Sequence, residues 1–155
     1  MKHEIASNYQ KNTGFLQYLL NGLTDNDMLT RTGESNTIGW ILGHLILHRG
    51  KTLQLLKIPC EIHESENAFE RGVEKNVELK IDVAQAIKDL MSRGEQLVKR
   101  ILELDKADLQ RTLDMSLPGG KNDLGSGLSF AAWHETFHIG QIDLIKVAVG
   151  MEGIK

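Results

Sequence analysis

Two pairs of histidines, each spaced by four residues, lie in largely apolar stretches of this chain. His44 and His48 occur in the segment NTIGWILGHLILHRG, and His134 and His138 occur in AAWHETFHIGQ. Residues four apart lie on one face of a helix, so each pair is predicted to place two imidazoles side by side. An i, i+4 pair can bring both imidazoles to a single metal ion. The spacing therefore predicts a site for a divalent transition metal inside a helical protein.

Chance does not explain the two pairs. Six histidines scattered at random over 155 residues would give only about 0.2 pairs of this spacing. The other two histidines, His3 and His63, lie in polar surroundings and are predicted to be exposed. The alternative to a metal site is a set of core histidines bonded to one another. Such a network must satisfy every imidazole, because burying a polar group without a partner is costly.

The expected chemistry follows from the number of ligands. Facing helices of a bundle commonly place ligands at one level of the core. Three imidazoles from two helices, with water as the fourth ligand, form an open site of the catalytic type. An open site lowers the pKa of the group that it binds. Imidazole suits several transition metals, and zinc or nickel is the expected ion.

The apolar periodicity predicts an all-α fold, a four-helix bundle in one domain spanning residues 1–155. A chain of this length is typical of a single domain and buries about two-thirds of its unfolded surface. The expected helices cover residues 7–22, 37–57, 83–104 and 128–149. On the last of them, seven residues at steps of three and four are expected on one inward face: Phe130, His134, Phe137, His138, Gln141, Ile142 and Ile145.

The third helix has the most regular pattern, an apolar seam of coiled-coil type that includes Gly94. Glycine weakens a helix, so Gly94 is expected to admit a neighbouring backbone or side chain. Asp82 is the predicted N-cap of this helix. Asn36 or Thr37 is expected to cap the start of the second helix. Ser126 or Ser129 is expected to cap the start of the last helix, and Gly150 should end it.

Two connections depart from helical periodicity. Residues 60–80 are polar and are expected to form a long crossover after the second helix, with a short helical turn near Ala68. Leu113, Met115 and Leu117 alternate with polar residues, which predicts a short, irregular, strand-like insertion before the fourth helix. Either connection is expected to shape a pocket beside the histidines.

Composition narrows the range of functions. The net charge is −3 without a basic block, which argues against nucleic-acid binding. No uncharged apolar run reaches the roughly 18 residues of a membrane span, and the first residues contain no secretory signal. Cys60 is the only cysteine, so no internal disulfide forms and a reducing cytoplasm is expected.

The two histidine segments resemble the signature segments of the DinB/YfiT-like superfamily of four-helix proteins. The similarity is carried by WILGHL at residues 40–45 and HETFHIGQ at residues 134–141. It implies that His44, His134 and His138 are the metal ligands. His48 is an addition to the common pattern, and it is expected to be a fourth or alternative ligand, a residue that orients a ligand, or an acid/base.

The resemblance also implies a function. It points to thiol-dependent transferases and isomerases that use low-molecular-weight thiols such as bacillithiol or mycothiol, with the metal holding the thiolate. A metal-dependent hydrolase and a non-catalytic metal-binding protein of the stress response remain alternatives. A pocket open beside the metal would favour an enzyme, whereas a site sealed by Trp40, Trp133 and Phe137 would favour the non-catalytic protein. No catalytic residue and no substrate are assigned.

A homodimer is the expected assembly. This expectation rests on the resemblance and on apolar residues that fall off the inward faces of the helices, such as Leu47, Leu102 and Val149.

Overall fold

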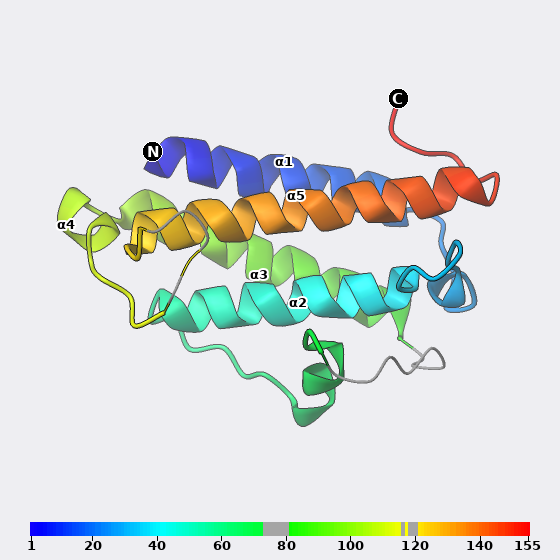
Figure 1. The fold of residues 1–155 in the computed structure, drawn as a ribbon, viewed down its shortest axis with the longest axis horizontal. Coiled ribbons are helices and arrows are strands. Elements are labelled where there is room, and N and C mark those ends of the chain that lie inside the picture. Colours follow the sequence, from blue (N-terminus) through cyan, green and yellow to red (C-terminus); the bar gives the residue numbers. More distant parts are fainter. Residues whose placement is uncertain (73–80, 116, 118–120) are drawn as a thin grey trace.

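Four long helices form the frame of the protein in the computed structural model, which describes residues 1–72, 81–115, 117 and 121–155 (Figure 1). They are α1 (Lys2–Leu20), α2 (Ile38–Leu55), α3 (Val83–Glu103) and α5 (Leu124–Ala148). The short elements are the 3-10 turns η1 (Asp27–Leu29) and η2 (Glu64–Phe69) and the one-turn helix α4 (Lys106–Leu109). The predicted all-α four-helix bundle is therefore confirmed.

The insertion before α5 contains no strand among its described residues. It forms a single antiparallel bridge between Thr112 and Asp123. Two backbone hydrogen bonds flank this bridge, from Leu113 N to Asn122 O (2.7 Å) and from Leu124 N to Arg111 O (2.9 Å). In the described part of the insertion, the predicted strand-like pairing is thus limited to this bridge.

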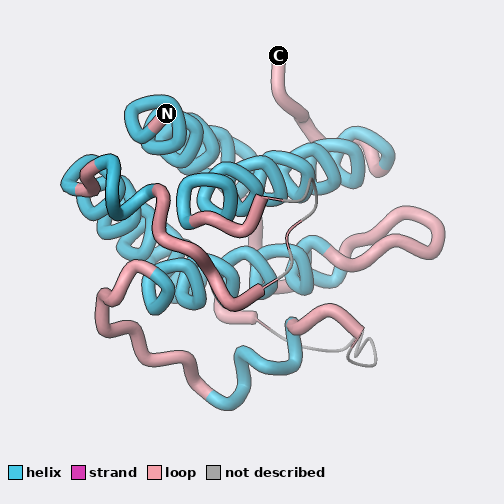
Figure 2. The backbone as a smooth tube through the Cα atoms, turned by 60° about the vertical axis from the view of Figure 1, so that its left-hand side comes forward, coloured by secondary structure: helices cyan, strands magenta, loops and turns pink. Residues whose placement is uncertain are grey.

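The order of packing differs from the order along the chain. α1 packs against α3 and α5, and α2 packs against the same two helices. In Figure 1, α2 and α3 run in one direction and α1 and α5 in the other. The predicted crossover returns the chain along α2, and η2 packs on the outer side of that helix (Figures 1 and 2). No helix in the described ranges is long and apolar enough to cross a membrane.

A polar layer divides the apolar core into two clusters. One cluster contains Leu16, Leu42 and Ile142, and the other contains Tyr9, Leu97 and Leu128. Between them each long helix contributes a small or polar buried group at its middle: Asn12 from α1, Arg49 from α2, Gly94 from α3 and Glu135 from α5.

Side-chain caps fix the starts of three long helices. Thr37 Oγ1 accepts from Trp40 N (3.1 Å) at the start of α2. Asp82 Oδ1 accepts from Gln85 N (3.0 Å) at the start of α3, as predicted. The predicted serine cap of α5 is wrong, because Asp123 accepts from Ser126 N (2.7 Å) and the helix begins at Leu124.

α1 begins five residues earlier than the predicted Ser7. Its first turns carry Ile5 and Ala6, both buried in the core. Lys2 Nζ also donates to the carbonyls of Leu102 (2.9 Å) and Leu104 (2.7 Å) at the end of α3. These contacts to a distant part of the chain hold the first turn in place.

Gly94 makes room for the guanidinium of Arg49. A Cβ at this position would lie 2.4 Å from Arg49 Nη1 and 3.0 Å from Thr13 Oγ1. Arg49 cannot easily withdraw, because its Nη1 donates to Leu90 O (2.6 Å) and its Nη2 to Thr13 Oγ1 (2.9 Å). The neighbour that the sequence left unidentified is therefore a buried arginine.

Gly94→Ala is expected to destabilise the protein by about 1–3 kcal/mol, because the added methyl displaces a side chain that is held on several sides. Gly14→Ala is the matched control, since this α1 glycine has no atom within 4 Å of the position of an added Cβ. The control should be stabilised by up to about 1 kcal/mol through helix propensity. Urea unfolding measures both changes. Stabilisation by both substitutions would contradict the close packing at Gly94.

Candidate metal centre

The two long apolar helices α2 and α5 bring three of the four core-facing histidines to one point. His44, His134 and His138 each offer one ligand atom, and these atoms lie within 4.8 Å of one another. Nε2 of His138 lies 3.1 Å from Nε2 of His134. Two nitrogen ligands of a tetrahedral zinc ion are roughly 3.3 Å apart. The three imidazoles thus lie close to the arrangement that one ion requires.

Neighbouring oxygen atoms orient two of these rings. Nδ1 of His44 donates to the Phe69 carbonyl (2.7 Å), and Nδ1 of His138 donates to Gln141 Oε1 (2.6 Å). Since each oxygen can only accept, the proton sits on Nδ1 and the lone pair on Nε2. Such outer contacts orient metal-binding histidines. Gln141, which the sequence places on the inward face of this helix, therefore orients His138.

The contact to His44 depends on Gly43. A Cβ at Gly43 would lie 2.6 Å from the ring carbons of Phe69. The absence of that atom lets the Phe69 ring pack onto the backbone of α2. The Phe69 carbonyl then reaches Nδ1 of His44, so a residue of the crossover orients a residue of the site.

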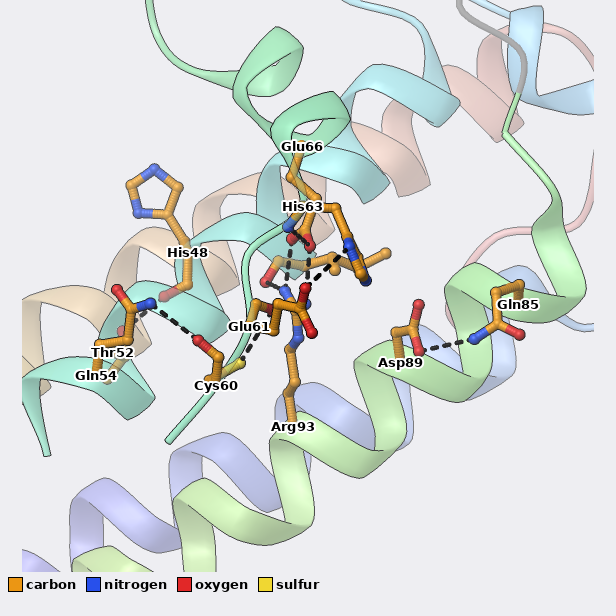
Figure 3. A network of polar contacts seen from close by, with 11 residues as sticks. His48, Thr52, Gln54, Cys60, Glu61, His63, Glu66, Gln85, Asp89 and Arg93 are labelled. Carbon is orange, nitrogen blue, oxygen red and sulfur yellow. Dashed lines mark hydrogen bonds and ion pairs between the residues drawn. The ribbon is translucent and has the colours of Figure 1, made fainter. Parts of the chain in front are cut away.

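An ion pair fastens the crossover to the bundle. Arg93 of α3 donates to both carboxylate oxygens of Glu66 in η2 (2.7 and 2.9 Å). It also donates to the carbonyls of Ile46 (2.7 Å) and Glu61 (3.2 Å). Figure 3 shows Arg93 reaching from α3 into this network. One arginine therefore links α3, the crossover and α2, and keeps η2 against the helix that carries His44.

Burial keeps the candidate ligands neutral. Desolvation lowers the pKa of His44 and of His134, and it lowers the pKa of His138 to about 4. Desolvation and the neighbouring histidines lower the pKa of His48 to about 3. A metal binds the neutral imidazole, so at neutral pH these rings need release no proton before binding.

His48 lies beside the cluster without joining it. Its ring centroid is 4.2 Å from that of His44 and 5.0 Å from that of His134. Its Nε2 is buried and has no hydrogen-bond partner in the part of the chain that the structure describes. A network of histidines bonded to one another without a metal would have to satisfy this atom, and it does not.

A cavity of about 510 Å³ opens beside the cluster. Its wall includes His44, His48 and His134, but not His138. The other lining residues come from α2, α5, the crossover and the insertion: Lys51, Thr52, Leu55, Glu70, Arg71, Met115, Leu117, Gly127, Phe130 and Ala131. Both connections that were expected to shape a pocket beside the histidines therefore contribute to it.

The aromatic residues do not seal the site. Trp133 is 59% exposed and Phe137 is 51% exposed. The prediction that Phe137 faces inward is therefore wrong, because the buried face of α5 runs through Ala132, Glu135 and Ile139 instead. Trp40 is buried and stacks on His44 at a centroid distance of 4.8 Å, beside the ligands and outside the cavity wall.

A buried ion pair that the histidine spacing did not predict lies next to the histidines, one residue after His48 on α2 and one residue after His134 on α5. Arg49, which follows His48, donates through Nε to Glu135 Oε2 (2.8 Å) and through Nη2 to Glu135 Oε1 (2.6 Å). Glu135 follows His134, so the pair ties α2 to α5 at the level of the site. Burial and the charge of Glu135 also raise the pKa of Tyr9. A signal was present, because Arg49 and Glu135 are the only Asp, Glu, Lys or Arg residues in 38–50 and 124–142.

Comparison with known proteins agrees with the fold. No curated protein sequence matches the chain. Among solved structures, YfiT from Bacillus subtilis matches with a TM-score of 0.74 and 16% sequence identity, over 97% of this chain and 89% of that one. YfiT is described as a probable metal-dependent hydrolase with an unusual four-helix bundle topology. The family model of the DinB superfamily matches residues 9–142, which include both histidine pairs. This chain therefore belongs to the DinB superfamily.

Proposed function

We propose that this protein is a metal-dependent enzyme that transfers a low-molecular-weight thiol to an electrophile, with His44, His134 and His138 as its metal ligands. The observation that carries the proposal is the cavity beside His44 and His134, since it gives an external molecule access to the cluster. A divalent ion held there would lower the pKa of a bound thiol or water.

The donor set fits such an ion. Three neutral imidazoles suit zinc and nickel, the ions that we propose, and leave a coordination position open. The Phe69 carbonyl and Gln141 hold two of the rings with their Nε2 atoms free. The ligand type, ring orientation and protonation state of the three histidines thus all suit such a metal ion.

The cavity wall suits a polar thiol. Lys51 and Arg71 supply positive charge, and Lys51 is paired with Glu70. Apolar side chains such as Leu117 and Phe130 complete the wall. We propose that the cations bind the carboxylates of a thiol such as bacillithiol, while the apolar wall accepts the electrophile. In the transfer, sulfur bonds to an electrophilic carbon, the leaving group departs with the bonding electrons, and the thiol proton passes to solvent.

We propose a cytoplasmic location, because such thiols occur in a reducing cytoplasm, where the single Cys60 would remain a thiol. Cell fractionation tests this location.

A hydrolase is the second candidate. The likeness to YfiT, described as a probable metal-dependent hydrolase, favours it. The open coordination position would then bind a water molecule, and the cavity would hold an ester or amide substrate. The non-catalytic alternative loses support, because Trp133 and Phe137 are exposed and leave the cavity open.

Titration of the Co²⁺-loaded protein with bacillithiol, mycothiol and glutathione separates these functions. A thiol-dependent transferase is expected to show a sulfur-to-metal absorption band with one of the three thiols, and His44→Ala should abolish the band. His3→Ala is the control, because His3 is exposed on α1. Absence of any spectral change at millimolar thiol would contradict the transferase. Turnover of a panel of esters and amides would then test the hydrolase.

We also propose that two copies of the chain associate through the outer face of α5. Trp133, Phe137, Leu144 and Val147 are exposed and recur at steps of four, seven and three, so they lie on one face. Such a face can pack against its own copy around a two-fold axis. Leu47, one of the residues behind the sequence prediction, is fully buried and plays no part in this contact.

Leu144→Glu is expected to weaken dimerisation at least about 100-fold, because it places an unpaired charge in the apolar contact. Light scattering at micromolar concentration measures the mass. Leu102→Glu on α3 is the control, since Leu102 is exposed but lies on another helix, and it should remain dimeric. A wild-type protein of monomer mass would contradict the proposed dimer.

A further inference from the structure

His48 differs from the other core histidines in what its ring contacts. Among the described residues, the cluster of potential ligand atoms within 4.8 Å contains His44, His134 and His138, but not His48. Thr52 Oγ1 donates to the backbone carbonyl of His48 (2.8 Å), and this bond does not involve the ring. Figure 3 shows the imidazole projecting from α2 away from the Arg93 network.

Among the described residues, none gives the buried Nε2 of His48 a hydrogen-bond partner. A buried polar atom without a partner is costly, and an exception of this kind in a folded protein calls for a reason. His44 and His138, in contrast, each use Nδ1 for a hydrogen bond within the protein. Among the four core histidines, His48 is the one whose ring has a buried nitrogen that no described residue bonds.

The cavity indicates which kind of molecule could contact the His48 ring, because this side chain lines it. His48 shares the cavity wall with His44 and His134, whereas His138 does not line the cavity. A ligand that approaches the histidine cluster through the cavity therefore arrives on the side where His48 stands. Lys51 and Arg71 on the same wall favour an anionic ligand.

We infer that His48 hydrogen-bonds the small anionic group that binds from the cavity at the open position beside His44, His134 and His138. The inference rests on the proposed metal site and adds a residue that binds the exchangeable ligand. A neutral imidazole has one N–H donor, which matches an anion without requiring a change of protonation.

A fourth metal ligand is the competing role. It would require Nε2 or Nδ1 of His48 to reach the point where the other three ligand atoms converge, and His48 lies outside that group. The two roles predict opposite effects on metal affinity, so one set of variants separates them.

The test is azide binding to the Co²⁺-loaded protein, followed in the visible spectrum of the ion. His48→Ala is expected to weaken azide binding about 10-fold, which corresponds to the loss of one hydrogen bond to a charged group, and to leave the Co²⁺ affinity within a few-fold of wild type. His48→Gln should restore most of the azide affinity, because its amide can donate. Thr52→Val is the control, since Thr52 lines the same cavity but its hydroxyl is already bonded to a backbone carbonyl.

Two results would overturn the inference. Equal azide affinity in wild type and His48→Ala would show that His48 does not contact the anion. A large fall in Co²⁺ affinity with a changed spectrum in His48→Ala would identify His48 as a metal ligand. Failure of the wild-type protein to take up Co²⁺ would overturn the proposed metal site as well, and this outcome is distinguishable because no variant would then show a cobalt spectrum.

Discussion

His138→Ala is expected to abolish stoichiometric metal binding. His138 is buried, its Nε2 lies 3.1 Å from Nε2 of His134, and its other nitrogen is held by Gln141. Removing one of three protein ligands should lower Zn²⁺ affinity by more than about 100-fold, since loss of an outer contact alone typically costs 10–100-fold. Elemental analysis of protein purified without a nickel column, followed by Zn²⁺ titration, measures this loss.

Two matched variants define the expected pattern of metal loss. Gln141→Ala should bind Zn²⁺ about 10–100-fold more weakly than wild type, because it removes only the group that orients His138. His3→Ala should bind normally, because His3 is exposed and remote in sequence from both pairs. Wild-type protein that takes up neither Zn²⁺ nor Ni²⁺ would show that the three histidines are not a metal site.

Arg49→Met is expected to destabilise the protein by about 3–5 kcal/mol, the usual cost of leaving one charge of a buried pair without its partner. The exposed fractions of the two side chains are only 1% and 5%, so water cannot replace the lost contacts. The arginine also donates to Leu90 O and Thr13 Oγ1, and its removal takes away these two hydrogen bonds as well. Urea unfolding of the metal-free protein measures the change without a contribution from metal binding.

Lys51→Met is the control for Arg49→Met, two residues along the same helix. The Lys51–Glu70 pair is at the surface, and its loss should cost less than about 1 kcal/mol. The double variant Arg49→Met, Glu135→Leu should recover most of the lost stability, because an apolar pair of similar volume often replaces a buried ion pair without loss. Additive destabilisation in the double variant would contradict the role assigned to the pair.

The sequence predicted the features that depend on residues only a few positions apart, such as helix faces and helix caps. The i, i+4 pairs placed His134 and His138 on one side of α5, and the regular seam of α3 placed Leu90 and Leu97 in the core. The capping residues Thr37 and Asp82 were also readable, because a cap bonds within three residues of its own position.

Features set by contacts between distant segments were not predicted. The start of α1 depends on Lys2 reaching the end of α3, some 100 residues away. Phe137 satisfies the spacing of the inward face, but the neighbouring helices lie on the side of Glu135 instead. A charged residue at that position reads as a solvent-facing one until its partner Arg49 is known. The periodicity of a single helix therefore does not show which residues pair across the bundle.

The packing order of the helices has a consequence for synthesis of the chain. α1 and α2 are consecutive but do not pack as neighbours; α3 and α5 each pack against both of them, and α5 is the last of the four long helices to be made. Until α5 leaves the ribosome, the three earlier helices expose an unpaired Arg49 and only one of the three clustered histidines. Non-local closure of this kind slows folding. The candidate site is thus assembled last, and a metal ion can bind all three histidines only after α5 has docked.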